Sequence, residues 1–401
     1  MTSSTTEQQA PDQRTDPDRF AALRGGVVRS ARRAWPALAL YLAVRLVGTL
    51  VFAVLSSGHG YADRGIFVYV DSGWYQKIAE RGYDTSISPH LSPFAFDPLY
   101  PALMALGHAV TTLSVTAIGL AVTWLAALAC AWALFELGSL LRDARTGVIV
   151  AVLWALMPSA VIQTGLYADT LAISLSAWAL YALLRRKLVT AAVLACLAGA
   201  TRPTANAIVA TVCVAAVVEF VRARKLGTSA GWRPFAAFVI APIGSIGFLL
   251  YVAYRMGSIG GYMRAQKKWG TGFGNTSQVL HRIKLGLESS THGGYNGSQA
   301  HITTGVLLIV PILILVMFLQ RQPWQVLTYT CIVVVIIYTA IHDYSVVPRE
   351  MLAAFPVLLA PAGWLASLRR QWVVWVVFAV LAVAAGWYAG FIPIDGGPGY
   401  P

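Results

Sequence analysis

The sequence contains few charged residues. Asp, Glu, Lys and Arg make up 12% of its 401 residues, whereas an average soluble domain has roughly 25%. Hydrophobic residues make up 57%, and the mean hydropathy is +0.64. Many apolar runs approach ~20 residues, the length of a helix that spans the hydrocarbon of a bilayer. This composition leaves no room for a sizeable soluble domain and predicts an all-α polytopic membrane protein.

Sequence motifs for metals and nucleotides are absent. No HxxH, CxxC or GxGxxG-type pattern occurs, so the sequence supports neither a metal site nor a nucleotide site. The four cysteines lie inside apolar runs without metal-ligand spacing, which is typical of small core residues. The net charge of +13 does not indicate a nucleic-acid partner, because most of it lies in short basic clusters beside apolar runs.

The basic clusters predict how the chain crosses the membrane. Residues 1–33 are polar and end in arginines without an acid among them, which predicts a disordered tail on the cytoplasmic side. About eleven transmembrane helices then fit into one domain over 34–394, followed by a tail over 395–401. The predicted spans are 35–55, 115–140, 148–165, 170–184, 188–200, 205–221, 234–254, 302–319, 324–341, 346–366 and 371–393.

The loop over 57–97 is predicted to lie outside the cytoplasm. It holds five of the chain's 17 acids: Asp63, Asp71, Glu80, Asp84 and Asp97. Within it, Trp74, Ile78 and Arg81 recur at helical spacing, which predicts a short helix in the membrane interface. The apolar piece 98–110 contains two prolines and is interpreted as a broken or re-entrant segment.

Further polar turns are predicted on the same face. Asp169 lies between two spans, and Arg202 precedes a proline that disfavours helix there, which predicts a helix broken at an arginine. The loop over 255–300 carries six Lys and Arg residues against one acid, and Arg349 directly follows a proline in a last outer turn. The outer face thus gathers Asp71, Asp169, Arg202, Lys267, Lys268 and Arg349.

This gathering of charges predicts glycosyl transfer from a lipid phosphate sugar. A carboxylate can remove the proton of an acceptor hydroxyl as the new bond forms. Arginine and lysine can stabilise the leaving phosphate, where negative charge develops. Structural interpretations stand beside this one, since Asp71 and Asp169 also fit helix caps. Arg202 also fits a structural ion pair, and the lysines of the basic loop fit headgroup anchors.

Six short motifs follow one another over residues 71–356. They are Asp71-Ser72-Gly73-Trp74-Tyr75 with Ile78-Ala79 and Gly82-Tyr83; Phe96-Asp97-Pro98-Leu99-Tyr100-Pro101; Met157-Pro158-Ser159-Ala160 with Tyr167-Ala168-Asp169; Ala200-Thr201-Arg202-Pro203-Thr204; Ala265-Gln266 with Trp269; and Pro348-Arg349 ahead of Phe355-Pro356. Their order and content resemble the signature of the PIG-V family, the GPI mannosyltransferase II-like enzymes of the GT-C superfamily. Three positions depart from it: Asp97 replaces an aromatic residue, Asp169 a Glu, and Val70 a Trp or similar aromatic.

The resemblance implies a GT-C-type bundle and a donor that is a polyprenyl- or dolichyl-phosphate sugar, with mannose as the typical sugar. Transfer to an extracytoplasmic lipid or glycan would invert the donor linkage, with Asp71 as general base and no metal or other cofactor required. The donor phosphate would be bound by Arg202, Arg349, Lys267 and Lys268. Residues that position the substrates would be Trp74, Tyr75, Asp97, Tyr100, Tyr167, Asp169, Gln266 and Trp269.

Two other interpretations share these sequence features. One is the same fold with another polyprenyl-phosphate sugar, such as arabinose or galactose. The other is a transporter or flippase for a polar lipid, although such proteins often carry inverted repeats and we find no convincing internal repeat. In each case the protein is expected in a cell membrane of the bacterial inner-membrane type, with its site outside the cytoplasm.

Overall fold

The computed structural model describes residues 16–57, 70–84, 90–273, 280, 283–284, 287–288, 291–292, 295–341 and 346–394. Its α-helices are α1 (Asp16–Ser57), α2 (Val70–Arg81), α3 (Leu99–Val110), α4 (Val115–Leu141), α5 (Ala144–Ala155), α6 (Asp169–Leu184), α7 (Leu188–Gly199), α8 (Asn206–Lys225), α9 (Arg233–Ile240), α10 (Ile243–Arg255), α11 (Gly261–Lys268), α13 (Gly297–Leu319), α14 (Trp324–Thr339), α15 (Val347–Glu350), α16 (Leu359–Ser367) and α17 (Gln371–Ile394). Shorter elements are the 3-10 helices η3 (Pro93–Ala95), η4 (Ala160–Gln163), η5 (Pro203–Ala205) and η7 (Met351–Leu358), and the strands β1 (Gly272–Phe273), β2 (Thr291–His292), β3 (Tyr295–Asn296) and β4 (Ala340–Ile341).

The predicted all-α fold is confirmed. The strands are two residues long and form two isolated antiparallel pairs, β1 with β4 and β2 with β3. α1 begins at Asp16, so residues 16–33 of the predicted tail are helical. Much of the predicted basic loop over 255–300 lies outside the described residues, as do Asp63 in the acidic loop and the turn at 342–345.

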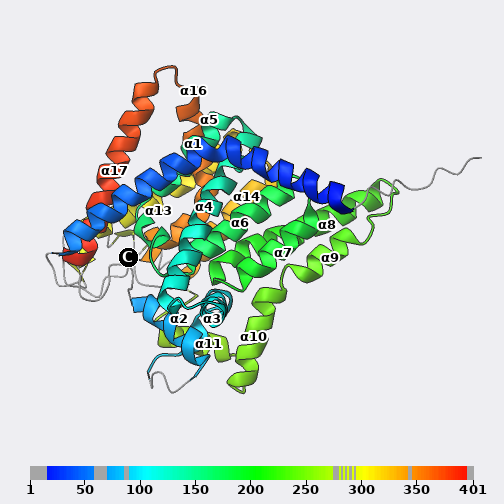
Figure 1. Ribbon diagram of the computed structural model, residues 1–401, viewed down its shortest axis with the longest axis horizontal. Coiled ribbons are helices and arrows are strands. Elements are labelled where there is room, and N and C mark those ends of the chain that lie inside the picture. Colours follow the sequence, from blue (N-terminus) through cyan, green and yellow to red (C-terminus); the bar gives the residue numbers. More distant parts are fainter. Residues whose placement is uncertain are drawn as a thin grey trace, which may run out of the picture.

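Helix length separates the elements that can cross a membrane from those that cannot. Within the described residues, seven helical stretches are long and apolar enough to span a bilayer, and five shorter apolar helices accompany them. Figure 1 shows the long helices packed side by side. The seven stretches are Gly25–Val54, Val115–Leu141, Pro203–Lys225, Arg233–Arg255, His301–Leu319, Val347–Ser367 and Gln371–Tyr388. The multi-pass architecture is confirmed, whereas length alone does not establish the predicted count of about eleven spans.

Small residues allow the helices to approach one another closely. A Cβ placed on Gly138 of α4 would lie 2.6 Å from the Cα of Gly147 on α5, and one on Gly147 would lie 2.4 Å from the carbonyl oxygen of Phe135. Buried alanines line α6 and α7 in the same way. Lipid tails are as apolar as the side chains, so close van der Waals contact through small residues holds transmembrane helices together.

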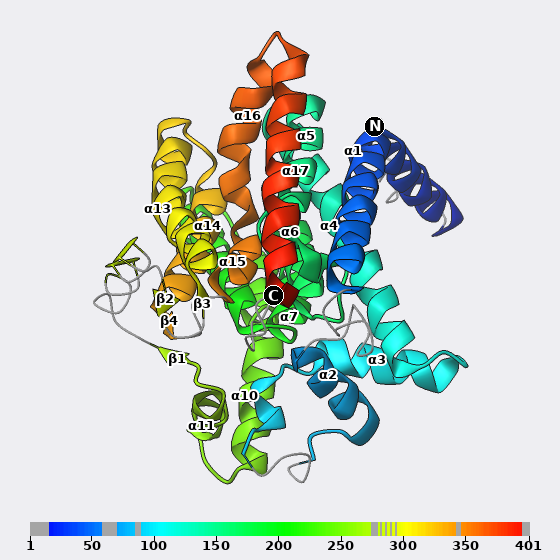
Figure 2. The ribbon, with the colours of Figure 1, turned by 90° about the vertical axis from the view of Figure 1, so that its left-hand side faces the viewer.

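α2 and α3 lie across one end of the bundle, and Figure 2 shows them turned against the direction of α16 and α17. α3 has 12 residues, about 18 Å of helix at 1.5 Å per residue, which is too short for a bilayer core of about 30 Å. Ser72 on α2 donates to the carbonyl of Leu166 at 3.1 Å, and Gln76 donates to Thr116 at the start of α4 at 2.6 Å. These bonds fasten the acidic loop to the bundle.

The series of helices is interrupted between α5 and α6 and between α7 and α8. α5 ends at Ala155 and α6 begins at Asp169, with η4 between them, so the predicted span over 148–165 is too long. Pro158 explains this end, because proline offers no N–H and disfavours helix at the residue before it. The break between α7 and α8 at Pro203 is where the sequence predicts it. Both interruptions leave backbone polar groups that other parts of the chain bind.

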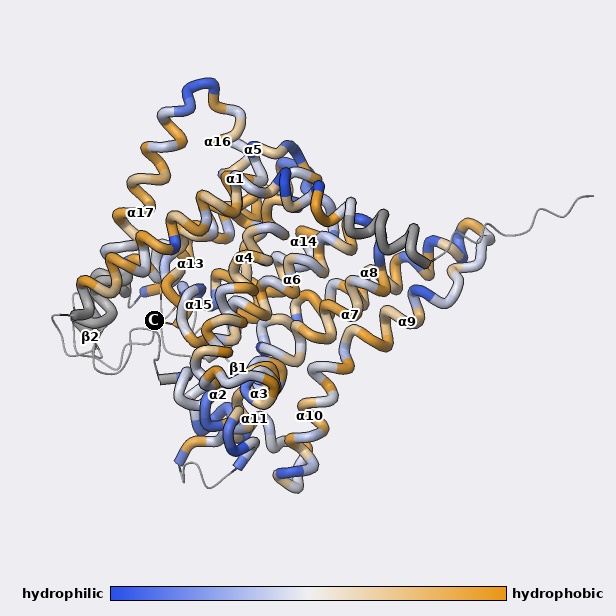
Figure 3. Tube along the Cα trace, viewed as in Figure 1, coloured by the Kyte–Doolittle hydropathy of each residue, from blue (hydrophilic) through white to orange (hydrophobic). Residues whose placement is uncertain are grey.

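The stretch Val347–Ser367 forms the centre of the bundle. In its most apolar window, 78% of the residues are buried, against 17–50% in the other six candidate spans. It joins α15, η7 and α16, and it bends at Ala354. Figure 3 shows hydrophilic residues around α2 and α11 and in the turn between α16 and α17. We call the end with α2, α3 and α11 the site end, and the end with the α4–α5 and α16–α17 turns the opposite end.

Candidate active site

Residues predicted on one face meet around Arg349 at the site end. Its guanidinium is 2% exposed and lies between two carboxylates: Nη1 is 2.9 Å from Oδ2 of Asp71, and Nη2 is 3.0 Å from Oδ2 of Asp169. Nε is 3.4 Å from Oδ1 of Asp169, so this second contact is bidentate. The ring of Tyr167 covers the guanidinium at 4.3 Å, a favourable cation–π distance. One buried arginine therefore holds two like charges together.

Arg202 reaches the same group from a different segment. Its Nη2 lies 3.4 Å from Oδ1 of Asp169 and 4.0 Å from Oε1 of Glu350. Its Nε is buried and has no hydrogen-bond partner among the described residues. We call Asp71, Asp169, Arg202, Arg349 and Glu350 the charge cluster. An unpartnered buried N–H is costly, and it offers a donor to an oxygen atom of a ligand.

Prolines place both arginines. Arg202 has extended backbone angles, φ −155° and ψ 146°, directly before Pro203, as steric contact with a following proline favours. Pro348 lies in the first turn of α15, where its missing N–H costs nothing because that group has no partner inside the helix. Each arginine thus lies where a helix starts, and its side chain reaches into the charge cluster.

The two aspartates are not simple helix caps. α2 begins at Val70, so Asp71 lies in its first turn. α6 begins at Asp169 itself, and the N-cap position is occupied by Ala168 without a side-chain bond. Both carboxylates lie at the positive end of a helix dipole, which stabilises negative charge there. Their contacts with Arg349 assign them to the charge cluster.

Asp97 is a buried carboxyl group beside the charge cluster, 6% exposed. Its neighbour along the chain, Leu99, donates its N–H to the carbonyl of Ala200 at 2.9 Å, which ties the Asp97 segment to the break at Arg202. Burial raises the pKa of Asp97 to about 7, although the nearby Arg202 charge and the residue's own backbone N–H act in the opposite direction. Within the described residues, no cation lies within 4 Å of this carboxyl.

Aromatic residues predicted to position substrates form a packed wall between α2, α3 and α11. The ring of Tyr75 lies 5.1 Å from both Phe96 and Tyr100, and Trp74 lies 5.2 Å from Trp269. Burial raises the pKa of Tyr75, so its hydroxyl is neutral at ordinary pH. Polar atoms of the wall bind backbone: Tyr100 donates to Gly119 at 2.9 Å and Trp269 to Ser92 at 3.0 Å. The wall fixes the position of the helix that carries Asp71.

The basic residues of α11 lie apart from the charge cluster. Gln266 turns inward and donates to the carbonyl of Ala95 at 3.1 Å and to the hydroxyl of Tyr262 at 2.8 Å. Lys267 and Lys268 are exposed in the last turn of the helix. Neither lysine forms an ion pair within the described part of the chain. Of the four predicted phosphate ligands, only the two arginines are joined to the aspartates.

Two buried charged residues that contact the charge cluster or the segment before α6 were not predicted as site residues. Glu350 follows Arg349 directly, and an acid beside an arginine at a helix start is a sequence signal that could have revealed it. The other is Arg45 in α1, 4% exposed. Its Nη1 donates to the carbonyl of Ala155 at 3.4 Å and its Nη2 to Thr164 at 3.3 Å. An arginine inside a transmembrane run is by itself a signal of a special role.

Arg45 supports the irregular segment that carries Tyr167 and Asp169. Ala155 is the last residue of α5, where backbone carbonyls lack partners inside the helix. Nearby, Tyr41 donates to Gln163 at 2.8 Å, and Gln163 donates to the carbonyl of Trp154 at 3.0 Å. These bonds satisfy the polar groups freed where α5 ends, and they fix the segment from which α6 begins.

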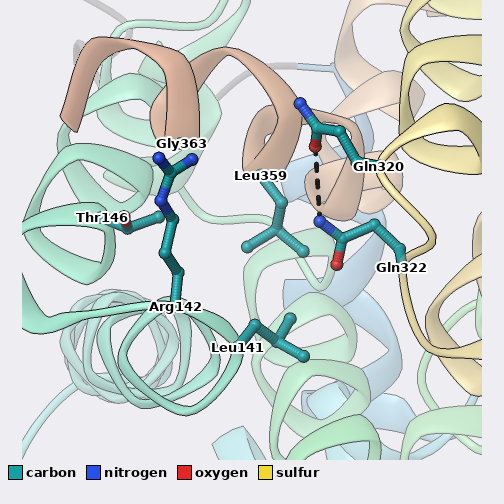
Figure 4. A pocket seen from close by; sticks show the side chains of 7 residues that line it. All are labelled: Leu141, Arg142, Thr146, Gln320, Gln322, Leu359 and Gly363. Atoms are coloured by element: carbon teal, nitrogen blue, oxygen red, sulfur yellow. Dashed lines mark hydrogen bonds between the residues drawn. The ribbon is translucent and has the colours of Figure 1, made fainter. Parts of the chain in front are cut away.

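A cavity of about 280 Å³ lies at the opposite end of the bundle. Figure 4 shows its lining, in which Gln322 donates to Gln320 at 3.4 Å on one side and the guanidinium of Arg142 lies beside Gly363 on the other. It is lined by Leu141, Arg142, Thr146, Gln320, Gln322, Leu359 and Gly363. Arg142 directly follows α4, whose 27 residues measure about 40 Å, while Thr116 near its start binds α2. The cavity is therefore remote from the charge cluster.

Metal ligands do not gather in the part of the chain that the structure describes: no three His, Cys, Asp or Glu side chains are placed to hold an ion together. The carboxylates of the charge cluster are directed at arginines instead.

Comparison with known proteins identifies the fold. No family model matches the chain, and no curated protein matches it significantly. The crystal structure of ArnT from Cupriavidus metallidurans bound to undecaprenyl phosphate matches with a TM-score of 0.51 and 16% identity, over 86% of this chain and 63% of that chain. The apo form of ArnT matches with the same TM-score and identity, over 90% and 64%.

An oligosaccharyltransferase from Archaeoglobus fulgidus matches with a TM-score of 0.45 and 16% identity, over 89% of this chain and 53% of that one. This chain thus spans less than two thirds of the length of these proteins. The likeness to ArnT shows the fold class, a GT-C-type membrane bundle. The resemblance to the PIG-V family remains a prediction from the motifs.

Proposed function

We propose that the protein is a membrane glycosyltransferase that moves a sugar from a polyprenyl-phosphate donor to a lipid or glycan acceptor outside the cytoplasm. The observation that carries the proposal is the charge cluster, in which α2, α6, α15 and the α7–α8 break bring two aspartates onto the buried Arg349 and the half-buried Arg202. The chain shares its fold with ArnT, which has been crystallised with undecaprenyl phosphate. The motif resemblance to the PIG-V family favours mannose as the sugar.

Asp71 is the general base of the proposed reaction. It removes the proton of the acceptor hydroxyl while that oxygen bonds to the anomeric carbon, and the bond from that carbon to the phosphate oxygen breaks. Attack from the face opposite the phosphate inverts the linkage, and no covalent enzyme intermediate forms. Asp71 suits this role because its side chain is 14% exposed, whereas that of Asp169 is 7% exposed and is bound by both arginines.

The donor phosphate binds at the arginines. Arg202 is the first ligand, since its Nε is a buried donor without a partner and a guanidinium matches phosphate oxygens in a bidentate way. Arg349 has its nitrogens engaged by two carboxylates, so it contacts phosphate only if Asp71 shifts. Such a shift would free the base when the donor arrives. Lys267 and Lys268 on α11 are placed to attract the phosphate from the membrane surface.

The proposal is tested with purified protein that is supplied separately with polyprenyl-phosphate mannose and with nucleotide-linked mannose. Transfer is expected from the lipid donor alone, and Arg202→Ala should lower kcat/KM by about 10²-fold or more, because removing one donor to the developing charge typically costs that much. Arg202→Lys keeps the charge but loses the planar guanidinium that can bind two phosphate oxygens. Its kcat/KM should therefore lie between those of wild type and Arg202→Ala. Activity with the nucleotide sugar alone, or a full rate in Arg202→Ala, would contradict the proposal and favour a lipid transporter.

A further inference from the structure

The charge cluster contains more acid than base. Asp71, Asp169 and Glu350 provide three carboxylates, while Arg202 and Arg349 provide two guanidiniums. Asp97 is a fourth carboxyl beside them, and it is buried. A phosphate that enters this place meets surplus negative charge if all four carboxyls are ionised. One of them therefore has to carry a proton when the donor is bound.

Asp97 is the carboxyl that is placed to carry it. Asp71 and Asp169 each have a guanidinium nitrogen at 3.0 Å or less, and Glu350 has one at 4.0 Å. Among the described residues, only Asp97 of these four lacks a cation within that distance. Its burial raises its pKa to about 7, so the protonated form is well populated at neutral pH. Uncompensated burial of a carboxyl favours the neutral acid.

The groups that face Asp97 come from three other elements. Arg202, at the α7–α8 break, favours the ionised form but does not overcome burial. Tyr83 after α2 and Tyr262 on α11 also interact electrostatically with Asp97. Burial raises the pKa of both phenols, so both are neutral in the pH range where Asp97 titrates. Arg255 of α10 binds the carbonyl of Tyr83 at 3.2 Å instead.

We propose that Asp97 is the proton donor of the transfer reaction, giving its proton to the phosphate oxygen that leaves the sugar. The proposal rests on the proposed function. The bond between the anomeric carbon and the acceptor oxygen forms, and the acceptor proton goes to Asp71. The bond to the phosphate oxygen breaks with its electron pair on oxygen, which takes the proton of Asp97. Solvent then returns both carboxyls to their starting states.

Geometry and acidity both fit this assignment. The bond from Leu99 to Ala200 holds the Asp97 segment against the break that carries Arg202. The charge of Arg202 acts on the Asp97 carboxyl, and its Nε is the donor proposed to bind the phosphate. A phosphomonoester takes up its second proton with a pKa of about 6, close to that of Asp97. Proton transfer between groups of similar acidity near the working pH is efficient, and such catalysis is worth roughly 10²–10⁴-fold.

The test is the pH profile of kcat/KM for transfer from polyprenyl-phosphate mannose between pH 5.5 and 9. This parameter reports the ionisations of the free enzyme, and neither the phosphodiester donor nor an alcohol acceptor titrates in this range. Wild-type activity should fall about tenfold per pH unit above a midpoint near 7. Asp97→Asn should lower kcat at least about tenfold, with little change in KM, and should remove the alkaline fall. Asp97→Glu should restore the decrease of kcat/KM at alkaline pH.

Asp143→Asn is the matched control, because Asp143 caps α5 at the opposite end of the bundle. It should keep both the rate and the alkaline fall. A flat wild-type profile up to pH 9, or an alkaline fall that persists in Asp97→Asn, overturns the role of Asp97 while the proposed function stands. Absence of transfer from the lipid donor at every pH overturns the proposed function itself. If Asp97→Asn does not fold, the wild-type profile and Asp97→Glu decide.

Discussion

The two ends of the helical bundle use arginine and aspartate in opposite ways. At the site end, Arg349 is 2% exposed and has carboxylate oxygens at 2.9 and 3.0 Å. At the opposite end, Arg142 and Asp143 have side chains 47% and 51% exposed and lie 3.9 Å apart. An exposed pair of this kind contributes about 1 kcal/mol or less, whereas breaking a buried pair is strongly destabilising. Burial and pairing, and not residue type, distinguish the charged residues of the site end from those of the opposite end.

The two ends also differ in which parts of the chain their charged residues connect. The charges of the site end come from segments as far apart as Asp71 and Arg349, and each bond joins separate helices. At the opposite end, the exposed Arg142 pairs with Asp143 in its own turn at 3.9 Å, and the half-buried Arg145 donates to the backbone carbonyl of Leu368 at 3.1 Å and not to an acid. Long-range pairs specify how helices meet, while turn charges orient the chain in the membrane. The predictions below test whether the two ends differ as strongly in effect as in structure.

The largest effect is expected from Asp71→Asn. The amide keeps the shape and can still accept from Arg349, so folding should persist, but it cannot take a proton. A general base is worth about 10²–10⁴-fold in rate, and kcat should fall by that factor. The measurement is single-turnover transfer from the lipid donor, with Asp143→Asn as the control at the opposite end. A near wild-type rate would mean that Asp71 is structural and would direct attention to Asp97 as the base.

Arg349→Met should cause the largest loss of stability. The buried Asp169 and the half-buried Asp71 would lose the cation that holds them together, and breaking a buried pair in this way costs about 3–5 kcal/mol. Thermal unfolding in detergent should show a clearly lower Tm, and Arg349→Lys should lie between this variant and wild type because it keeps the charge without the fork. Arg142→Met at the opposite end should leave Tm almost unchanged. Equal shifts for the two methionine variants would remove the distinction between the ends.

Much of the fold follows from composition and charge, because a bilayer leaves the backbone few choices. Apolar runs of helical length predict the bundle, and Pro203 predicts the break at Arg202 for a local steric reason. The short helix with Asp71 follows from the spacing of Trp74 and Ile78. The fold class needs only this local information. The end of α5 at Ala155 was misjudged because the apolar run continues past it, although Pro158 interrupts the helix.

The candidate site is less predictable, because it depends on which side chains reach across helices. The sequence places Asp71, Asp169, Arg202 and Arg349 on one face but does not show that Arg349 holds both aspartates. It treats the lysines of α11 like the arginines, and only the structure separates them. Arg45 was missed because a single arginine hardly changes the hydropathy of a span. Its partners are backbone and hydroxyl groups, which carry no sequence signal.

The smallest effect is expected from the double variant Lys267→Gln, Lys268→Gln. Both side chains are exposed on α11 and make no ion pair in the described part of the chain. Exposed charges contribute about 1 kcal/mol or less, which corresponds to roughly fivefold in kcat/KM. The loss should lie in KM for the donor and should shrink as salt rises, because a screening length of about 8 Å at 0.15 M salt weakens exposed charges.

The arginines of the charge cluster should respond differently to salt, since partly buried and buried pairs are screened much less. Measuring kcat/KM of the lysine variant and of Arg202→Lys at low and high salt therefore compares exposed lysines with a half-buried arginine as proposed phosphate ligands at the site end. The loss of kcat/KM in the lysine variant should become smaller as salt rises, whereas the loss in Arg202→Lys should persist. A loss of more than tenfold in the kcat of the lysine variant at every salt concentration would mean that α11 contacts the phosphate directly. The distinction between residues that attract the phosphate and residues that bind it would then be wrong.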